Sequence, residues 1–196
     1  WAGSVSYLDT PIVPVASFVG HPNNQVDVEP PDHSPVIKSV QGAGQIGPYI
    51  TSANQPITIT AAGTVPVPDP TSLGYGSANT ILRDYGFGAQ GAGSSVTIGG
   101  VAATIVSWNT NSIVVNAPSS GQLVVTRDNG GVAGKSSVVG IYVTVGGPAP
   151  IRVTPGPGAI QAAIDNAGTV DGSLIIVEPG TYNELVILHK NVRLQG

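Results

Sequence analysis

The feature that most restricts the fold is a series of short β-branched segments between Pro35 and Gly147. They read PVIKSVQG, PITITAAG, SSVTIGG, ATIVSW, SIVVNAP, GQLVVTRDNGG and VGIYVTVGG, and Gly, Pro, Asn and Ser separate them. Each segment is long enough for a strand of about four to seven residues. Short strands separated by turn residues are typical of an antiparallel sandwich. We therefore expect two packed sheets in this region.

Alternation within these segments predicts which side chains are buried. Val96 and Ile98 alternate with the polar residues Ser95 and Thr97, so one face of that strand should be buried and the other hydrated. The Asn129-Gly130 dipeptide in RDNGG tolerates positive φ at both central positions of a type I′ turn. The strands on either side of it should therefore pair.

Composition excludes several classes of partner. Seven basic residues against eleven acidic ones include no basic run that could follow a phosphate backbone, so we expect no nucleic-acid partner. The chain has no cysteine for a disulfide or a thiolate metal site, and no apolar run of about 20 residues to span a membrane. Low charge, abundant Thr, Ser, Asn and Gly, and the lack of Cys resemble bacterial surface and secreted β proteins, which predicts an extracellular or cell-surface location.

Residues 1–34 are expected to form an extended, proline-rich leader. Within it, Thr10–Val19 is apolar enough to dock as an edge strand. The acidic stretch DVEPPDH has two interpretations. Asp27, Glu29 and Asp32 could hold a hard cation, or the stretch is a solvated linker, which the missing calcium-loop spacing favours.

Residues Tyr85–Gly131 carry a resemblance to a known family. The bend YGFG, the strand SVTIGG, the Trp-bearing strand ATIVSW and SIVVNAP follow one another as in IPT/TIG domains, which are immunoglobulin-like sandwiches. The resemblance implies one such domain over residues 35–147. An insertion of about 20 residues, Thr64–Asp84, departs from the family; it is either a binding loop or a packed surface flap.

Aromatic side chains near the insertion are the candidate ligand contacts. Trp108 is in phase with the apolar Val106, so we expect it to pack in the core. Tyr75 and Tyr85 are the candidates for stacking against a sugar ring.

The pattern changes after the linker Gly146–Pro150. Ile160, Ala163, Ile164 and Ala167 form one stripe of a short helix near residues 158–167, with Pro157 in its first turn. Three strands should follow, at LIIV (174–177), LVIL (185–188) and VRLQG (192–196). The phrases IQAAIDNA and PGTYNE resemble the opening of the pectin-lyase-like family, which implies a capping helix and the first coil of a right-handed parallel β-helix over residues 151–196.

No catalytic residues, metal ligands or cofactor-binding residues are predicted. His21, His33 and His189 are scattered, and no nucleophile motif is present. Four carboxylates near the C-terminus, Asp165, Asp171, Glu178 and Glu184, are expected to lie on the helix surface or in turns, where Glu184 can accept backbone hydrogen bonds. In the family that this region resembles, the catalytic acids and bases lie on later coils.

The sequence thus predicts an all-β chain: an immunoglobulin-like sandwich, a capping helix and the first coil of a parallel β-helix. We expect a non-enzymatic extracellular module that is structural or binds polysaccharide or a cell-surface protein. The alternative is the non-catalytic N-terminal part of a secreted carbohydrate-active enzyme. Because one coil is less than a stable repeat array needs, we expect further coils in the parent protein, or self-association through the terminal coil and the leader.

Overall fold

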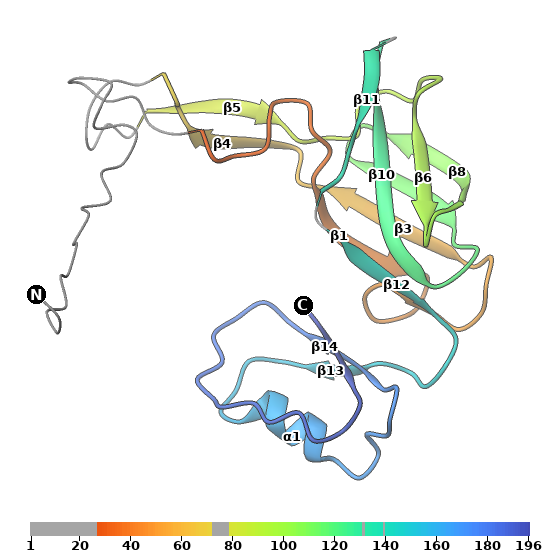
Figure 1. Ribbon diagram of the computed structural model, residues 1–196, viewed down its shortest axis with the longest axis vertical. Helices are drawn as coiled ribbons and strands as arrows, with labels where there is room; N and C mark the ends of the chain where they lie inside the picture. Colours follow the sequence, from red (N-terminus) through yellow and green to blue (C-terminus); the bar gives the residue numbers. More distant parts are fainter. Residues whose placement is uncertain (1–26, 72–78, 131, 139) are drawn as a thin grey trace, which may run out of the picture. The chain divides into compact units, whose positions relative to one another are not determined.

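The computed structural model describes residues 27–71, 79–130, 132–138 and 140–196 (Figure 1). These residues belong to two compact units, a smaller one that contains 27–31, 65–71 and 79–83 and a larger one that contains the rest. Strands make up 43% of the described residues, above the norm of about 20–25% for globular proteins, so the expected all-β class is confirmed. The leader Thr10–Val19 lies outside the described residues.

The first sheet of the larger unit has four antiparallel strands. Its order is β1 (Ile37–Gly42), β3 (Pro56–Ala61), β9 (Ser112–Asn116) and β8 (Thr104–Asn109). β1 is an edge strand that pairs with β3 alone. After β1, residues 43–48 turn the chain away from this sheet and into the second one.

The second sheet has six strands. In order they are β2 (Tyr49–Ile50), β12 (Ile141–Val145), β10 (Gly121–Asn129), β6 (Ser95–Ile98) and β7 (Val101–Ala102), with β11 (Val132–Ser136) paired to the end of β10. β2 runs parallel to β12, and the other pairs are antiparallel. Each of the seven segments expected to form strands contains one.

The turn after β10 is displaced from the predicted position. β10 and β11 pair as expected, but Asn129 lies opposite Val132 and therefore ends the strand. Gly130, with φ of 66°, follows it in the turn. The hairpin prediction is confirmed, whereas the placement of Asn129 at the centre of the turn is wrong.

The two sheets bury a common hydrophobic core. Val96 and Ile98 of β6 are buried, as their alternation predicts, at 1% and 0% exposure. Aliphatic side chains from both sheets complete the cluster, namely Ile37, Val40, Ile50, Ile57, Ile59, Ile113, Val115, Leu123, Val125 and Val143, together with Phe87.

A bulge in β8 changes which residues face this core. The register shifts between Ile105 and Ser107, so Ile105 and Trp108 both face inward although they are three residues apart. Val106 is 59% exposed. Trp108 does pack against the core, but the prediction that Val106 shares its face is wrong, because a bulge breaks the period of two.

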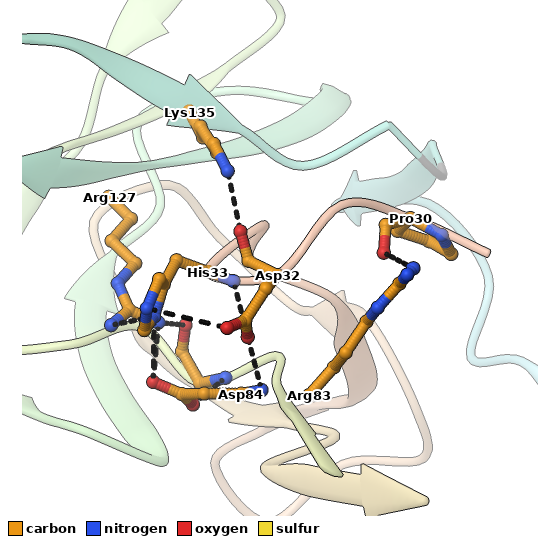
Figure 2. Close-up of polar contacts among 8 residues, drawn as sticks. Pro30, Asp32, His33, Arg83, Asp84, Arg127 and Lys135 are labelled. Atoms are coloured by element: carbon orange, nitrogen blue, oxygen red, sulfur yellow. Dashed lines mark hydrogen bonds and ion pairs between the residues drawn. The ribbon is translucent and has the colours of Figure 1, made fainter. Parts of the chain in front are cut away.

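The insertion Thr64–Asp84 contains a two-stranded sheet of β4 (Thr64–Pro68) and β5 (Thr80–Asp84). Near the end of β5, the Arg83 guanidinium donates two hydrogen bonds to the Asp27 carboxylate, at 3.0 and 2.6 Å. It also donates to the Glu29 carbonyl at 3.3 Å and to the Pro30 carbonyl at 2.9 Å, and Figure 2 shows the bond to Pro30. Arg83 is 6% exposed, so these acceptors compensate the burial of its charge.

The C-terminal region contains a small parallel sheet and the helix α1 (Figure 1). Its strands, in order, are β13 (Ile151–Val153), β14 (Leu174–Val177) and β15 (Arg193–Gln195). Ile151, Ile175 and Leu194 are aligned across the three strands. The strands expected at LIIV and VRLQG are present, β13 was not predicted, and the strand expected at 185–188 is absent.

The predicted helix is confirmed as α1 (Ala159–Asp165). Gly158, with φ of 63°, precedes it, so Pro157 lies before the first turn and not within it. Ile164 is fully buried, and Ile160 and Ala163 are partly buried against the same cluster, whereas Ala167 is exposed. No helix among the described residues is long and apolar enough to cross a membrane.

Candidate functional site

The densest polar cluster of the larger unit joins residues that are distant in sequence (Figure 2). His33 lies in a turn with φ of 64°, Asp84 ends β5 and Arg127 lies near the end of β10. The Arg127 Nη1 atom lies 2.9 Å from the Asp84 carboxylate and also donates to the Gly86 carbonyl at 2.9 Å. Arg127 thereby fixes the YGFG bend to β10.

The His33 ring lies between two carboxylates and this guanidinium. Its Nδ1 atom is 3.2 Å from Arg127 Nη2 and 3.5 Å from Asp84 Oδ2, and its Nε2 atom is 3.5 Å from Asp32 Oδ2. Because a guanidinium can only donate, the Arg127 contact requires a lone pair on Nδ1. The Asp84 carboxylate faces the same Nδ1 atom and requires a proton on it, so the contacts to Arg127 and to Asp84 use different protonation states of the ring.

Both carboxylates of the cluster favour the ionised form. The Asp84 N–H bond at 2.8 Å is the largest cause that lowers the pKa of Asp32, and the His33 N–H also donates to it. For Asp84, partial burial is the largest single effect and raises the pKa. The Gly86 N–H, Arg127 and His33 together outweigh burial, so the pKa of Asp84 is lowered.

These contacts use the oxygen atoms that a general base would need. Asp84 Oδ1 accepts from Gly86, and Asp84 Oδ2 faces Arg127 and His33. The Asp32 carbonyl accepts from Lys135 of β11. The cluster therefore fastens the turn at His33 and the YGFG bend to β10 and β11, which is a structural role.

The acidic stretch was one candidate cation site. Asp27 is engaged by Arg83, and its pKa is lowered chiefly by that hydrogen bond, while Asp32 belongs to the cluster around His33. Among residues 27–71, 79–130, 132–138 and 140–196, no three His, Cys, Asp or Glu side chains are grouped so that they could hold a metal ion.

The C-terminal carboxylates contact separate partners. Glu184 accepts from the backbone N–H groups of Ile160 and Gln161, at 3.0 and 2.9 Å, as its expected turn role requires. Glu178 forms an ion pair with Arg152. Asp171 accepts from the Asn191 N–H at 3.1 Å. Asp165 accepts from the Gln161 side chain at 2.8 Å, at the end of α1.

Glu184 and Gln161 together explain why LVIL is not a strand. The Gln161 side-chain oxygen accepts from the Ile187 N–H at 2.7 Å. This side chain of α1 therefore supplies the acceptor that a neighbouring strand would otherwise provide. Tyr182 Oη donates to the carbonyls of Val153 and Glu178, at 3.2 and 2.9 Å. The phrases IQAAIDNA and PGTYNE are therefore joined to each other.

We expect Glu184→Ala to loosen this junction more than Glu178→Ala does. Glu184 satisfies two partly buried N–H groups, so its loss should destabilise the C-terminal region by about 1–3 kcal/mol. The ion pair of Glu178 is more exposed and should contribute no more than about 1 kcal/mol. Hydrogen exchange of the Ile160 and Gln161 amides measures the difference; equal acceleration in both variants would contradict it.

The aromatic candidates differ from those expected. Tyr75 lies outside the described residues. Tyr85 is only 4% exposed, so its ring offers no free face, and the expectation that it stacks against a sugar is corrected. Sequence reasoning missed Tyr142, which is 45% exposed on β12 and lies beneath the Arg193 guanidinium at 5.6 Å. Alternation was the available signal, because Tyr142 lies between the inward-facing Ile141 and Val143.

Tyr142 borders a cavity of about 530 Å³. Gly140 and Ile141 of the β12 side and residues 193–196 line the remainder. Arg193 also donates to Thr144 Oγ1 at 3.3 Å, which leaves further guanidinium N–H groups for a ligand. An aromatic face beside such donors suits a sugar ring.

Neither a protein-family model nor a curated protein sequence matches this chain.

Proposed function

We propose that this chain is a non-enzymatic extracellular surface or matrix module with a structural or binding role. In this proposal an IPT/TIG-like sandwich precedes the start of a pectin-lyase-like β-helix. One observation carries it: the acidic side chains of the described C-terminal region are engaged in holding the region together. Glu184 and Gln161 join the helix to the chain beyond β14, and Glu178 pairs with Arg152.

The parallel sheet supports the β-helix part of the proposal. Ile151, Ile175 and Leu194 form one aligned row, and α1 packs on the cluster that contains Ile151 and Ile175, whereas Leu194 is 39% exposed. Rows of aliphatic side chains on successive parallel strands are how coils of a solenoid bury their surface. The same row supports the alternative function, the non-catalytic N-terminal part of a secreted carbohydrate-active enzyme, because such enzymes use the same scaffold.

The proposed ligand is polysaccharide, held at Tyr142. Tyr142 combines an exposed ring with an adjacent guanidinium and a cavity, whereas Tyr85 is buried. Stacking on a single aromatic side chain typically contributes about 0.5–1.5 kcal/mol, so one site gives weak binding. A polysaccharide that contacts many copies of this chain on a surface would bind more strongly than this single-site free energy suggests.

Affinity electrophoresis in gels that contain polysaccharide tests this function. We expect retardation by at least one neutral or acidic polysaccharide and its loss in Tyr142→Ala. The matched control is Val170→Ala, which truncates an apolar side chain of similar exposure, 51% against 45%, away from the cavity. Retardation that is unchanged in Tyr142→Ala, or lost equally in both variants, would contradict the assignment.

Self-association is the second part of the proposed role. Leu185, Ile187 and Leu188 are 83%, 60% and 60% exposed, and β15 is an edge strand of the parallel sheet. Exposed strand edges beside apolar side chains promote pairing between chains. We expect light scattering to report a concentration-dependent mass that falls when Leu185 and Ile187 are both changed to Ser; a constant monomer mass would contradict this part.

A further inference from the structure

A second cavity, of about 420 Å³, lies beside the free edge of β1. Four consecutive residues of β1, Lys38–Gln41, line it, and so does the following segment Gln45–Pro48. The register with β3 shifts between Ile37 and Ser39, but from Ser39 to Gln41 the side chains alternate between the two faces, so these consecutive residues can line one cavity only along the edge of the strand. This cavity is therefore bordered by backbone as well as by side chains.

The edge of β1 is closed at both ends and open between them. Before the strand, the Val36 N–H donates to the Tyr85 carbonyl at 3.1 Å, and at its end the Gly42 N–H donates to the Gly47 carbonyl at 2.8 Å. Between these bonds β1 pairs only with β3, on its other side. The backbone near Lys38 and Val40 is thus available to one further extended segment.

The opposite wall comes from the parallel sheet. Arg152, Ile176 and Gln195 are aligned on β13, β14 and β15, and all three line the cavity. Ile176 is 9% exposed and offers an apolar surface, while Gln195 offers an amide. Such a wall accommodates alternating apolar and polar side chains of an extended chain.

Charge selects the kind of segment. Arg152 is paired with Glu178, whereas Lys38 is exposed and has no ion pair with any residue that the structure describes. An anionic side chain on an incoming segment can therefore pair with Lys38 without displacing an ion pair of the described residues. Lysine on an edge strand discourages pairing with an arbitrary strand, because its ammonium must keep its hydration or find an anion. A carboxylate on the incoming segment supplies that anion.

We propose that this cleft, defined by Lys38–Gln41, Gln45–Pro48 and the row Arg152, Ile176 and Gln195, binds an extended acidic peptide segment of a partner protein. The segment adds to β1 through backbone hydrogen bonds and places an Asp or Glu opposite Lys38. This inference goes beyond the polysaccharide site at Tyr142: the two cavities share Ile141, Gln195 and Gly196, but the proposed determinant here is Lys38, which does not line the Tyr142 cavity.

Two peptides test the proposal on the full chain. Both are eight residues long, acetylated and amidated, and alternate valine with threonine; one carries a central glutamate and the other a central lysine. We expect the glutamate peptide to slow hydrogen exchange of the Lys38 and Val40 amides. It should bind about two- to tenfold more tightly than the lysine peptide, because a glutamate opposite Lys38 is attracted to it across the strands and a lysine there is repelled.

Lys38→Glu provides the decisive variant and should reverse the preference between the peptides. Lys190→Glu is its matched control: it makes the same change of charge at a partly exposed lysine whose contact is the Asn166 carbonyl, outside the cleft. The control should keep the preference for glutamate. The proposal is overturned if neither peptide protects the β1 amides, if both bind equally, or if the two variants behave alike.

Discussion

Replacing Phe87 by alanine is expected to destabilise the larger unit by about 3–5 kcal/mol, the range for truncating a buried aromatic side chain. Phe87 is fully buried in the core that both sheets share. Its ring centroid lies 6.3 Å from that of Trp108, in an edge-to-face arrangement. Trp108 in turn donates to the Gly88 carbonyl at 3.0 Å, so the YGFG bend and β8 stabilise each other.

Urea denaturation followed by tryptophan fluorescence measures this loss. Val106→Ala is the matched control, because Val106 is 59% exposed and its truncation should change stability by no more than about 0.5 kcal/mol. Phe87→Leu keeps part of the buried volume and should remain folded if the alanine variant does not. A loss in Val106→Ala as large as that in Phe87→Ala would show that the bulge in β8 is absent.

Asp84→Ala is expected to cost about 1.5–3 kcal/mol at neutral pH, because it removes an ionised acceptor from several donors. The Gly86 N–H and Arg127 each lose a partner, and the Arg127 side chain is 12% exposed. The double variant Asp84→Ala/Arg127→Ala should lose less than the sum of the two single variants, because the pair is in direct contact.

The pH dependence of this loss follows from the sign of the shift. The pKa of Asp84 is lower in the folded chain than its unfolded value of about 3.9. Its ionised form therefore adds stability that is present above the unfolded pKa and is lost as pH falls through the folded pKa. The stability difference between wild type and Asp84→Ala should be steady from pH 7 to pH 5 and shrink below about pH 4. A difference that persists unchanged at pH 2 would contradict this.

Local patterns predicted the regular elements well. Val96 and Ile98 alternate with polar residues and are buried, and the stripe through Ile160 and Ile164 forms a helix that buries Ile164. These predictions succeed because a period of two or 3.6 residues is set by backbone geometry. Glu184 was correctly expected to accept backbone hydrogen bonds in a turn, although its donors on α1 were not foreseen.

Predictions failed where distant segments decide the conformation. The bulge in β8 depends on pairing with β9, and no local signal in TIVSWN marks it. LVIL has the composition of a strand, but Gln161 takes the Ile187 N–H that a strand would need. The cluster of Asp32, Asp84 and Arg127 joins three segments whose proximity only the complete fold determines.

The candidate site was only partly accessible from sequence for the same reason. Tyr142 could have been found by alternation, because it occupies the outward position of its strand. Arg193, which supplies the neighbouring guanidinium, lies in β15, 51 residues after Tyr142, and no sequence pattern connects these two residues. The cleft beside β1 likewise could not be predicted from sequence, because it depends on β14 and β15 lying opposite Lys38 in the fold.

We propose that the carboxylates of the described C-terminal region are structural and that the chain has no enzymatic activity. The most direct measurement is release of unsaturated or reducing products from pectate, pectin and other uronate polymers, with and without calcium, by the purified chain and by Glu178→Gln and Glu184→Gln. We expect no product above the level without protein in any of the three. Product formation by the wild-type chain that either substitution abolishes, with folding stability unchanged, would contradict it.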